Sequence, residues 1–149
     1  MERHGHRLIQ FGMALFLAAL LIGLAVPAFR LPRLALSAHL LLITQGLFLM
    51  ILGVIWPRLR LSSRMARATF ILAIYACLAA SMANLVGASI GAGDSIVPMA
   101  AGGHRGSANQ ELLVVVLLRS GGAAFIAASV LVLWGLRLPA TTSSRASLS

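Results

Sequence analysis

The sequence predicts an all-α membrane protein, built as a bundle of four transmembrane helices. Of its 149 residues, 60% are apolar and only 10% are charged, whereas soluble domains are roughly 45–50% apolar and about 25% charged. Four apolar stretches approach or exceed the ~20 residues that a helix needs to cross a bilayer. The period-two alternation of a membrane β-barrel is absent, so helices are the structure that we expect.

Prolines mark the ends of the four stretches, because a missing N–H does no harm at a helix end. The first stretch has Gln10 as its only strongly polar residue, and it is too long for the apolar region of a cleaved signal peptide. Trp56 and Trp134 lie near span ends, as interfacial aromatic residues do. We therefore expect transmembrane spans over residues 8–26, 36–56, 68–89 and 111–136.

The spans form one transmembrane domain over residues 1–137, and the polar tail over residues 138–149 is expected to be disordered. The net charge is +9 and all twelve basic residues are arginine, but they are scattered singly, which argues against nucleic-acid binding. Two arginines precede the first span, four lie in the second connection and two in the tail, against three in the other connections. This bias predicts that both ends are cytoplasmic and that the chain crosses the inner (cell) membrane.

Small residues recur at helical spacing within three of the spans. Inside lipid, small side chains allow helices to approach closely, so these positions are expected to form the helix contacts: Ala79, Ala83 and Gly87; Ser120, Ala124 and Ala128; Gly46 and Gly53. Four helices enclose little interior of their own. A site for a sizeable ligand would need neighbouring subunits, and we therefore expect a homo-oligomer.

Polar side chains at membrane depth are costly, so each is a candidate functional residue. His39 lies just inside the second span and Gln45 lies deeper in it. Asn84, near the end of the antiparallel third span, and Glu111, at the start of the fourth, are expected at a similar depth. We predict that the four converge at one end of the bundle, where Gln45, Asn84 and Glu111 contact a substrate. Ordinary alternatives are a solvated histidine, amides that bond between helices, and an acid favoured in a first helical turn.

Arg119 lies about two turns inside the fourth span, where an arginine costs about 2.5–3.5 kcal/mol on insertion scales. It shares a helix face with Glu111, eight residues earlier, and the two side chains are expected to reach toward each other. Because snorkelling is difficult from this depth, Arg119 is expected to meet an acid, a carbonyl or an anionic group of a bound cofactor.

The pattern of polar residues argues against several functional classes. No Ser/His/Asp set, P-loop or paired-carboxylate site is present in the sequence. A proton-coupled exporter would place an acid deep in the membrane, whereas Glu111 opens a helix. An electron-transfer cytochrome with two axial histidines needs two deep histidines, and only His39 qualifies. A metal held by one histidine keeps an open position, which suits Lewis-acid chemistry on a small apolar substrate.

Short motifs follow one another in a fixed order along the spans. In the second span, Ala38-His39 is followed after five residues by Gln45-Gly46. This order resembles the Ala-His-x5-Asn/Gln-Gly pattern of the hydroxylaminobenzene mutases and the related styrene oxide isomerases. The likeness covers about residues 5–136 and includes Phe11-Gly12, Asn84 and the segment from Gly102-Gly103-His104 to Gln110-Glu111, which is similar to the mutase branch.

The resemblance implies a four-helix membrane isomerase. Similarity to the styrene oxide isomerases implies a homotrimer with haem b near the subunit contacts, in which His39 is the axial ligand of the iron. It places Gln45 where that branch has a substrate-contacting Asn, although Gln is one methylene longer. The tyrosine that this branch carries about one turn after the Asn matching Asn84 falls near Ala88, and its loss favours the mutase branch.

The leading hypothesis is a catalysed hydroxyl shift that converts hydroxylaminobenzene, a small aromatic substrate, into 2-aminophenol. Ferric haem on His39 would act as the Lewis acid, and Gln45 and Asn84 would orient the amine and the ring. One alternative is a haem-dependent isomerase that converts aryl epoxides into aldehydes. Another is a non-catalytic membrane subunit or small transporter, which predicts a colourless preparation.

Overall fold

The computed structural model describes residues 2–137, which form four long helices and three short helical turns. Each long helix is long and apolar enough to cross a membrane, so the prediction of a four-helix membrane protein is confirmed. The long helices are α1 (Glu2–Ala25), α2 (Pro32–Ile55), α3 (Ser63–Ile90) and α5 (Ala108–Gly135). The short turns are η1 (Val26–Ala28), η2 (Trp56–Arg58) and α4 (Pro98–Ala101).

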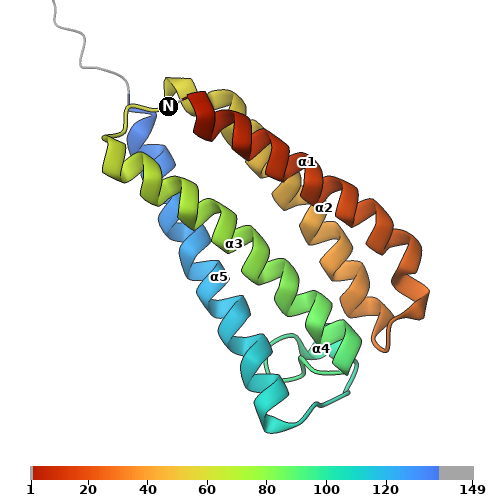
Figure 1. The fold of residues 1–149 in the computed structure, drawn as a ribbon. Helices are drawn as coiled ribbons and strands as arrows, with labels where there is room; N and C mark the ends of the chain where they lie inside the picture. The colour runs from red at the N-terminus through yellow and green to blue at the C-terminus, as the bar shows by residue number, and fades with distance from the viewer. Residues whose placement is uncertain (1, 138–149) are drawn as a thin grey trace, which may run out of the picture.

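The four long helices are arranged as two antiparallel hairpins (Figure 1). Helix α1 packs along α2, α3 packs along α5, and the two hairpins join mainly through α2 and α3. The beginning of α1, the α2–α3 connection and the end of α5 lie at one end of the molecule, and α4 lies at the other (Figure 1). The predicted tail over residues 138–149 lies outside the described residues.

Each long helix begins several residues before the span expected from hydropathy, because capping residues rather than apolar residues set the start. Helix α2 has a proline in its first turn, which is favourable there. The Ser62 side chain accepts a hydrogen bond from the Met65 amide at 3.4 Å at the start of α3. At the start of α5, Ser107 and Gln110 form a capping box.

Glycines bring the backbones of α1 and α2 into direct contact. A Cβ added at Gly12 would lie 2.6 Å from the Gly46 carbonyl oxygen, and one added at Gly53 would lie 2.6 Å from that of Gly5. Because the helices are antiparallel, each step of seven residues up α1 is matched by a step of seven down α2. The expected contact at Gly46 and Gly53 is confirmed, and its partners are the two glycines of α1.

The predicted small-residue faces of α3 and α5 also pack against each other. A Cβ added at Gly121 would lie 3.0 Å from the Ala80 amide nitrogen and 3.2 Å from the Ala79 Cβ. Ala124 and Ala128 are buried, and the Tyr75 hydroxyl is 2.8 Å from the Ser120 hydroxyl across this contact. Close approach of small residues therefore holds both hairpins together.

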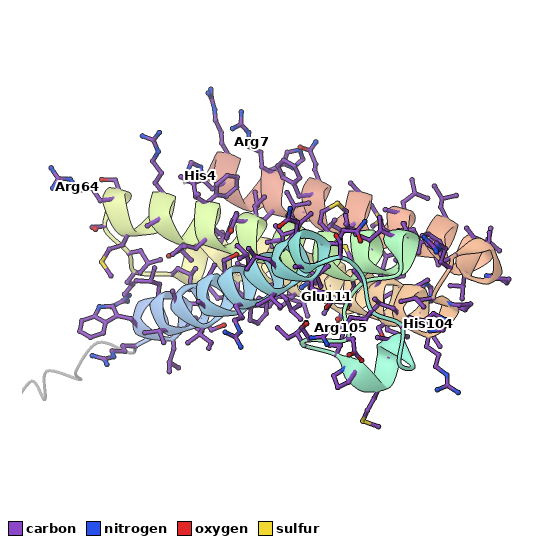
Figure 2. The ribbon with its side chains drawn as sticks, turned by 90° about the horizontal axis from the view of Figure 1, so that it is seen from below. His4, Arg7, Arg64, His104, Arg105 and Glu111 are labelled. Atoms are coloured by element: carbon purple, nitrogen blue, oxygen red, sulfur yellow. The ribbon has the colours of Figure 1, made fainter. Side chains whose placement is uncertain are left out.

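The two tryptophans differ in their surroundings. Trp134 is exposed, with the Arg137 guanidinium 3.9 Å from its ring centroid, as expected of an interfacial residue. Trp56 is buried and packs near the His4 and Phe70 rings, so the interfacial interpretation of Trp56 is wrong. Trp56 belongs to the core cluster that includes Leu59 and Leu61. Arg64 lies at the opposite end of the bundle from the loop that carries His104 and Arg105 (Figure 2).

Candidate functional site

The His39 imidazole lies between α2 and α1 and is partly exposed. Its Nδ1 is 2.7 Å from the Ala19 carbonyl oxygen. A carbonyl only accepts hydrogen bonds, so Nδ1 carries the proton and donates, and in the neutral ring Nε2 keeps its lone pair free. A histidine that donates its other ring N–H to a backbone carbonyl is the usual arrangement of a metal ligand.

Gln45 faces α3 rather than α1. Its side chain is buried, and its Oε1 accepts a hydrogen bond from the equally buried Ser81 hydroxyl at 2.5 Å. This bond leaves the Gln45 amide NH2 group to donate elsewhere. Asn84 lies one turn further along α3, on the same side of the helix as Ser81, and its Nδ2 donates to the Ala80 carbonyl at 3.2 Å.

A groove of about 490 Å³ runs between α2 and α5, with α3 at its base. Gln45 and Thr44 give the groove its polar side chains, and most of its lining is apolar, including Leu118, Phe125 and Ile126 of α5. A cavity of roughly 150 Å³ is enough for benzene. The groove therefore has room for a substituted benzene beside the Gln45 amide.

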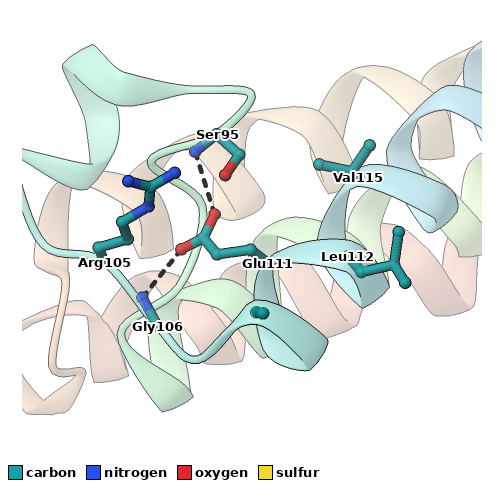
Figure 3. Close-up of a pocket in the computed structure, with 7 residues that line it drawn as sticks. Ser95, Arg105, Gly106, Glu111, Leu112 and Val115 are labelled. Atoms are coloured by element: carbon teal, nitrogen blue, oxygen red, sulfur yellow. Dashed lines mark hydrogen bonds between the residues drawn. The ribbon is translucent and has the colours of Figure 1, made fainter.

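Glu111 is buried at the start of α5, where its carboxylate accepts hydrogen bonds from three backbone amides, of which Figure 3 shows those of Ser95 and Gly106. Its Oε1 accepts from Gly93 and Gly106, both at 2.9 Å, and its Oε2 accepts from Ser95 at 3.0 Å. A pocket of about 400 Å³ adjoins this carboxylate. Both oxygens are already engaged by the α3–α5 loop, so the geometry favours a structural role for Glu111.

Arg119 lies near the middle of α5 and is exposed on the surface of the single chain. It does not meet Glu111 as expected, because the Glu111 carboxylate turns into the loop and bonds to its amides. A charged side chain at this depth is costly when it faces lipid. Within residues 2–137, no hydrogen bond or ion pair to the Arg119 guanidinium is formed.

The four polar residues make different contacts within the single chain, and their convergence on one site stays a prediction. His39 contacts α1, Gln45 contacts α3, and Glu111 holds the loop between α3 and α5. Gln45 accepts a hydrogen bond from Ser81, and Asn84 lies on the same face of α3 as Ser81. Six residues amount to about one and two-thirds helical turns, so His39 and Gln45 point to different sides of α2.

A single imidazole is suited to a cofactor that brings its other ligands with it. Within residues 2–137, no group of three His, Cys, Asp or Glu side chains is placed to hold a bare metal ion. A tetrapyrrole needs only an axial ligand from the protein. The partly exposed ring of His39, with Nδ1 bonded and Nε2 free, fits that requirement.

Three features of the site were not anticipated from the sequence: the Ser81 hydroxyl, the Ala19 carbonyl and Gly23. Ser81 is a polar residue at membrane depth, which was a signal for it. A signal for Ala19 was also present, because Gly5, Gly12 and Ala19 repeat every seven residues, as do Gly53, Gly46 and His39.

Comparison with known proteins shows the family. The family model described as styrene oxide isomerase matches residues 4–137. Hydroxylaminobenzene mutase HabB of Ectopseudomonas oleovorans is 43% identical over 131 residues, which cover 88% of this chain and 80% of that protein. Hydroxylaminobenzene mutase HabA of the same organism is 39% identical over 125 residues, covering 84% of this chain and 93% of that protein. No solved structure matches the chain. With one family model spanning nearly all of the described residues, this membrane protein belongs to the styrene oxide isomerase family and is an isomerase.

Proposed function

We propose that the chain is a hydroxylaminobenzene mutase, which converts hydroxylaminobenzene into 2-aminophenol. The observation that carries the proposal is its similarity to two proteins of that name over more than four-fifths of its length. The N–O bond of the substrate breaks, a C–O bond forms at the ortho carbon, and the proton lost from that carbon is balanced by one gained at nitrogen. The reaction is therefore an isomerisation with no net redox change.

The groove beside Gln45 supports this choice of substrate. Its apolar lining suits the aromatic ring, and the Gln45 NH2 group, freed by the bond from Ser81 to Oε1, is available to donate to the substrate. Holding the ring beside the departing oxygen favours return to the ortho carbon. A largely apolar surround also hinders capture of the reactive species by water.

Haem b, held through His39 Nε2, is the cofactor that we propose. Ferric haem would supply a Lewis-acidic iron that withdraws electron density from the hydroxyl oxygen of the substrate. The chain contributes the orientation of the imidazole, through the bond from Nδ1 to Ala19. Arg119, exposed at mid-membrane depth, is available to neutralise a cofactor carboxylate.

We also propose a homo-oligomer, and specifically a trimer, as the resemblance to the styrene oxide isomerases implies. His39 and Gln45 face different sides of α2, and the Gln45 groove is open on the single chain. A ligand that contacts both groups therefore lies between copies of the chain. The arginine bias supports an inner-membrane protein with both ends in the cytoplasm.

The test is the purified His39→Ala variant, assayed for 2-aminophenol by chromatography and for a haem absorption band. Loss of both activity and the band is expected. His104→Ala is the matched control, because its Nδ1 also lies near a backbone carbonyl, that of Ala101 at 3.2 Å, but in an exposed loop. If His39→Ala keeps an unchanged band and full activity, the proposed role of His39 is wrong.

Isomerisation of aryl epoxides to aldehydes is the second candidate, and the name of the matching family model favours it. Ala88, near the position where the resemblance implies a tyrosine in that branch, is buried and has no hydroxyl to offer an epoxide. Offering the purified protein hydroxylaminobenzene and styrene oxide separately distinguishes the two reactions. Because the chain is an isomerase, the alternative of a non-catalytic subunit or small transporter is excluded.

A further inference from the structure

We propose that Gly23 is a positioning residue. Because it has no side chain, it leaves a space on α1, called here the imidazole seat, in which the Ala19 carbonyl holds the His39 imidazole in one tautomer. The proposal rests on the function of His39 proposed above. It concerns a residue with no side chain, and it assigns the orientation of the imidazole to the backbone of α1.

The first observation is the space at Gly23. A Cβ added there would lie 2.7 Å from Cε1 and 2.8 Å from Nδ1 of His39, and the third atom that it would approach is Nε2 of the same ring, at 3.5 Å. At Gly12, by contrast, the added Cβ would meet the Gly46 carbonyl and the backbone of Met50. The missing side chain at Gly23 therefore makes room for the imidazole, which supplies the three nearest atoms.

The second observation is the hydrogen bond that this space permits. In a regular helix the Ala19 carbonyl accepts from the amide of residue 23, and its second lone pair accepts from His39 Nδ1 at 2.7 Å. A side chain at position 23 would lie across the approach to that lone pair. The imidazole is thus held as the Nδ1–H tautomer, with Nε2 as the atom that is free to bind a ligand.

The third observation is that the seat continues the glycine contact between α1 and α2. Gly5 lies against Gly53 and Gly12 against Gly46, and the next pair in the same seven-residue steps is Ala19 with His39. The imidazole fills the place that a glycine backbone fills in the two preceding pairs. Its position is therefore fixed by the same close approach of the two backbones.

The experiment removes the His39 side chain and supplies free imidazole in its place. The full-length His39→Gly variant in detergent is supplied with hemin and titrated with imidazole or with 1-methylimidazole, and binding is followed by the haem absorption band. Both compounds can bind iron, but only imidazole retains an N–H for the Ala19 carbonyl. We expect imidazole to be preferred by roughly two- to tenfold, the equivalent of one hydrogen bond, relative to the preference of hemin alone in the same detergent.

The double variant His39→Gly/Gly23→Ala tests the glycine. Its added methyl should weaken binding of both compounds and abolish the preference between them, whereas His39→Gly/Gly122→Ala should keep it, because a Cβ at position 122 meets no atom within 4 Å. Equal affinities in His39→Gly, or an unchanged preference in His39→Gly/Gly23→Ala, would overturn the proposal.

A second measurement tests the imidazole seat independently of the proposed cofactor. If the wild-type protein takes up no haem, the cofactor assignment fails, and the seat is tested in that protein by ¹⁵N NMR of labelled histidine. The His39 signals, identified by their absence in His39→Gln, should report the Nδ1–H tautomer, and Gly23→Ala should shift them while Gly122→Ala, which meets no atom within 4 Å, does not. Identical His39 signals in Gly23→Ala and wild type would show that the glycine has no such role.

Discussion

Replacing Glu111 by glutamine is expected to release the loop between α3 and α5 rather than to impair substrate contact alone. Glutamine keeps one oxygen, which can still accept from Gly93 and Gly106, but it turns an NH2 group toward the Ser95 amide. A hydrogen bond to a charged group contributes about 1.5–3 kcal/mol, and one between neutral groups about 0.5–1.5 kcal/mol. Losing one charged bond and weakening two others amounts to about 3–5 kcal/mol.

Hydrogen exchange of the backbone amides is the direct measurement. At 1.4 kcal/mol per factor of ten, the amides of Gly93, Ser95 and Gly106 should exchange roughly a hundredfold faster, or more, in Glu111→Gln. Gln110→Ala is the matched control in the same first turn, because it removes only the bond from the Ser107 amide at 2.9 Å and should cost about 1 kcal/mol. Unchanged exchange at the three amides, together with a raised KM, would refute the structural role and restore the interpretation of Glu111 as a substrate contact.

The other predictions concern the Gln45 groove and the α3–α5 contact. Ser81→Ala removes the donor to Gln45 Oε1, so the KM for hydroxylaminobenzene should rise severalfold while the haem band stays unchanged; a normal KM would show that the hydroxyl does not orient the amide. Gly121→Ala should destabilise the protein by about 1–3 kcal/mol through overpacking against Ala79 and Ala80, measured by thermal unfolding in detergent. Gly122→Ala, which meets no atom within 4 Å, should be neutral or stabilising by up to about 1 kcal/mol, and equal loss at both positions would contradict the packing described here.

The four-helix architecture was predictable because crossing a bilayer is a requirement on local composition. Any stretch of about 20 residues must satisfy its own backbone within one helix, so hydropathy along the chain is sufficient. The packing positions were also predictable, since lipid leaves small residues as the main means of close approach. Gly46 and Gly53, which were expected at a helix contact, lie at one for that reason.

The arrangement of the site was less predictable, because depth in the membrane does not fix the side of a helix. His39 and Gln45 lie on the same span, yet they face α1 and α3 respectively. The role of Glu111 depends on backbone amides of a glycine-containing loop, and amides leave no mark in the residue types of a sequence. The contact between Gly23 and His39 was not predicted, because the contribution of a glycine there is an absent side chain.

The glycine contact between α1 and α2 has a consequence for the part of α1 that His39 contacts. A slip of α1 by one residue would bring the side chain of Phe11 or Met13 against the α2 backbone, where only Gly12 now fits. Only one register of the hairpin is compatible with both glycine pairs, and the more distant pair lies fourteen residues, or about 21 Å, along α2 from the imidazole. An insertion between Gly5 and Gly12 would therefore leave only one of the two pairs in register, and keeping the distant pair would shift Ala19 and Gly23 by one helical position relative to the imidazole.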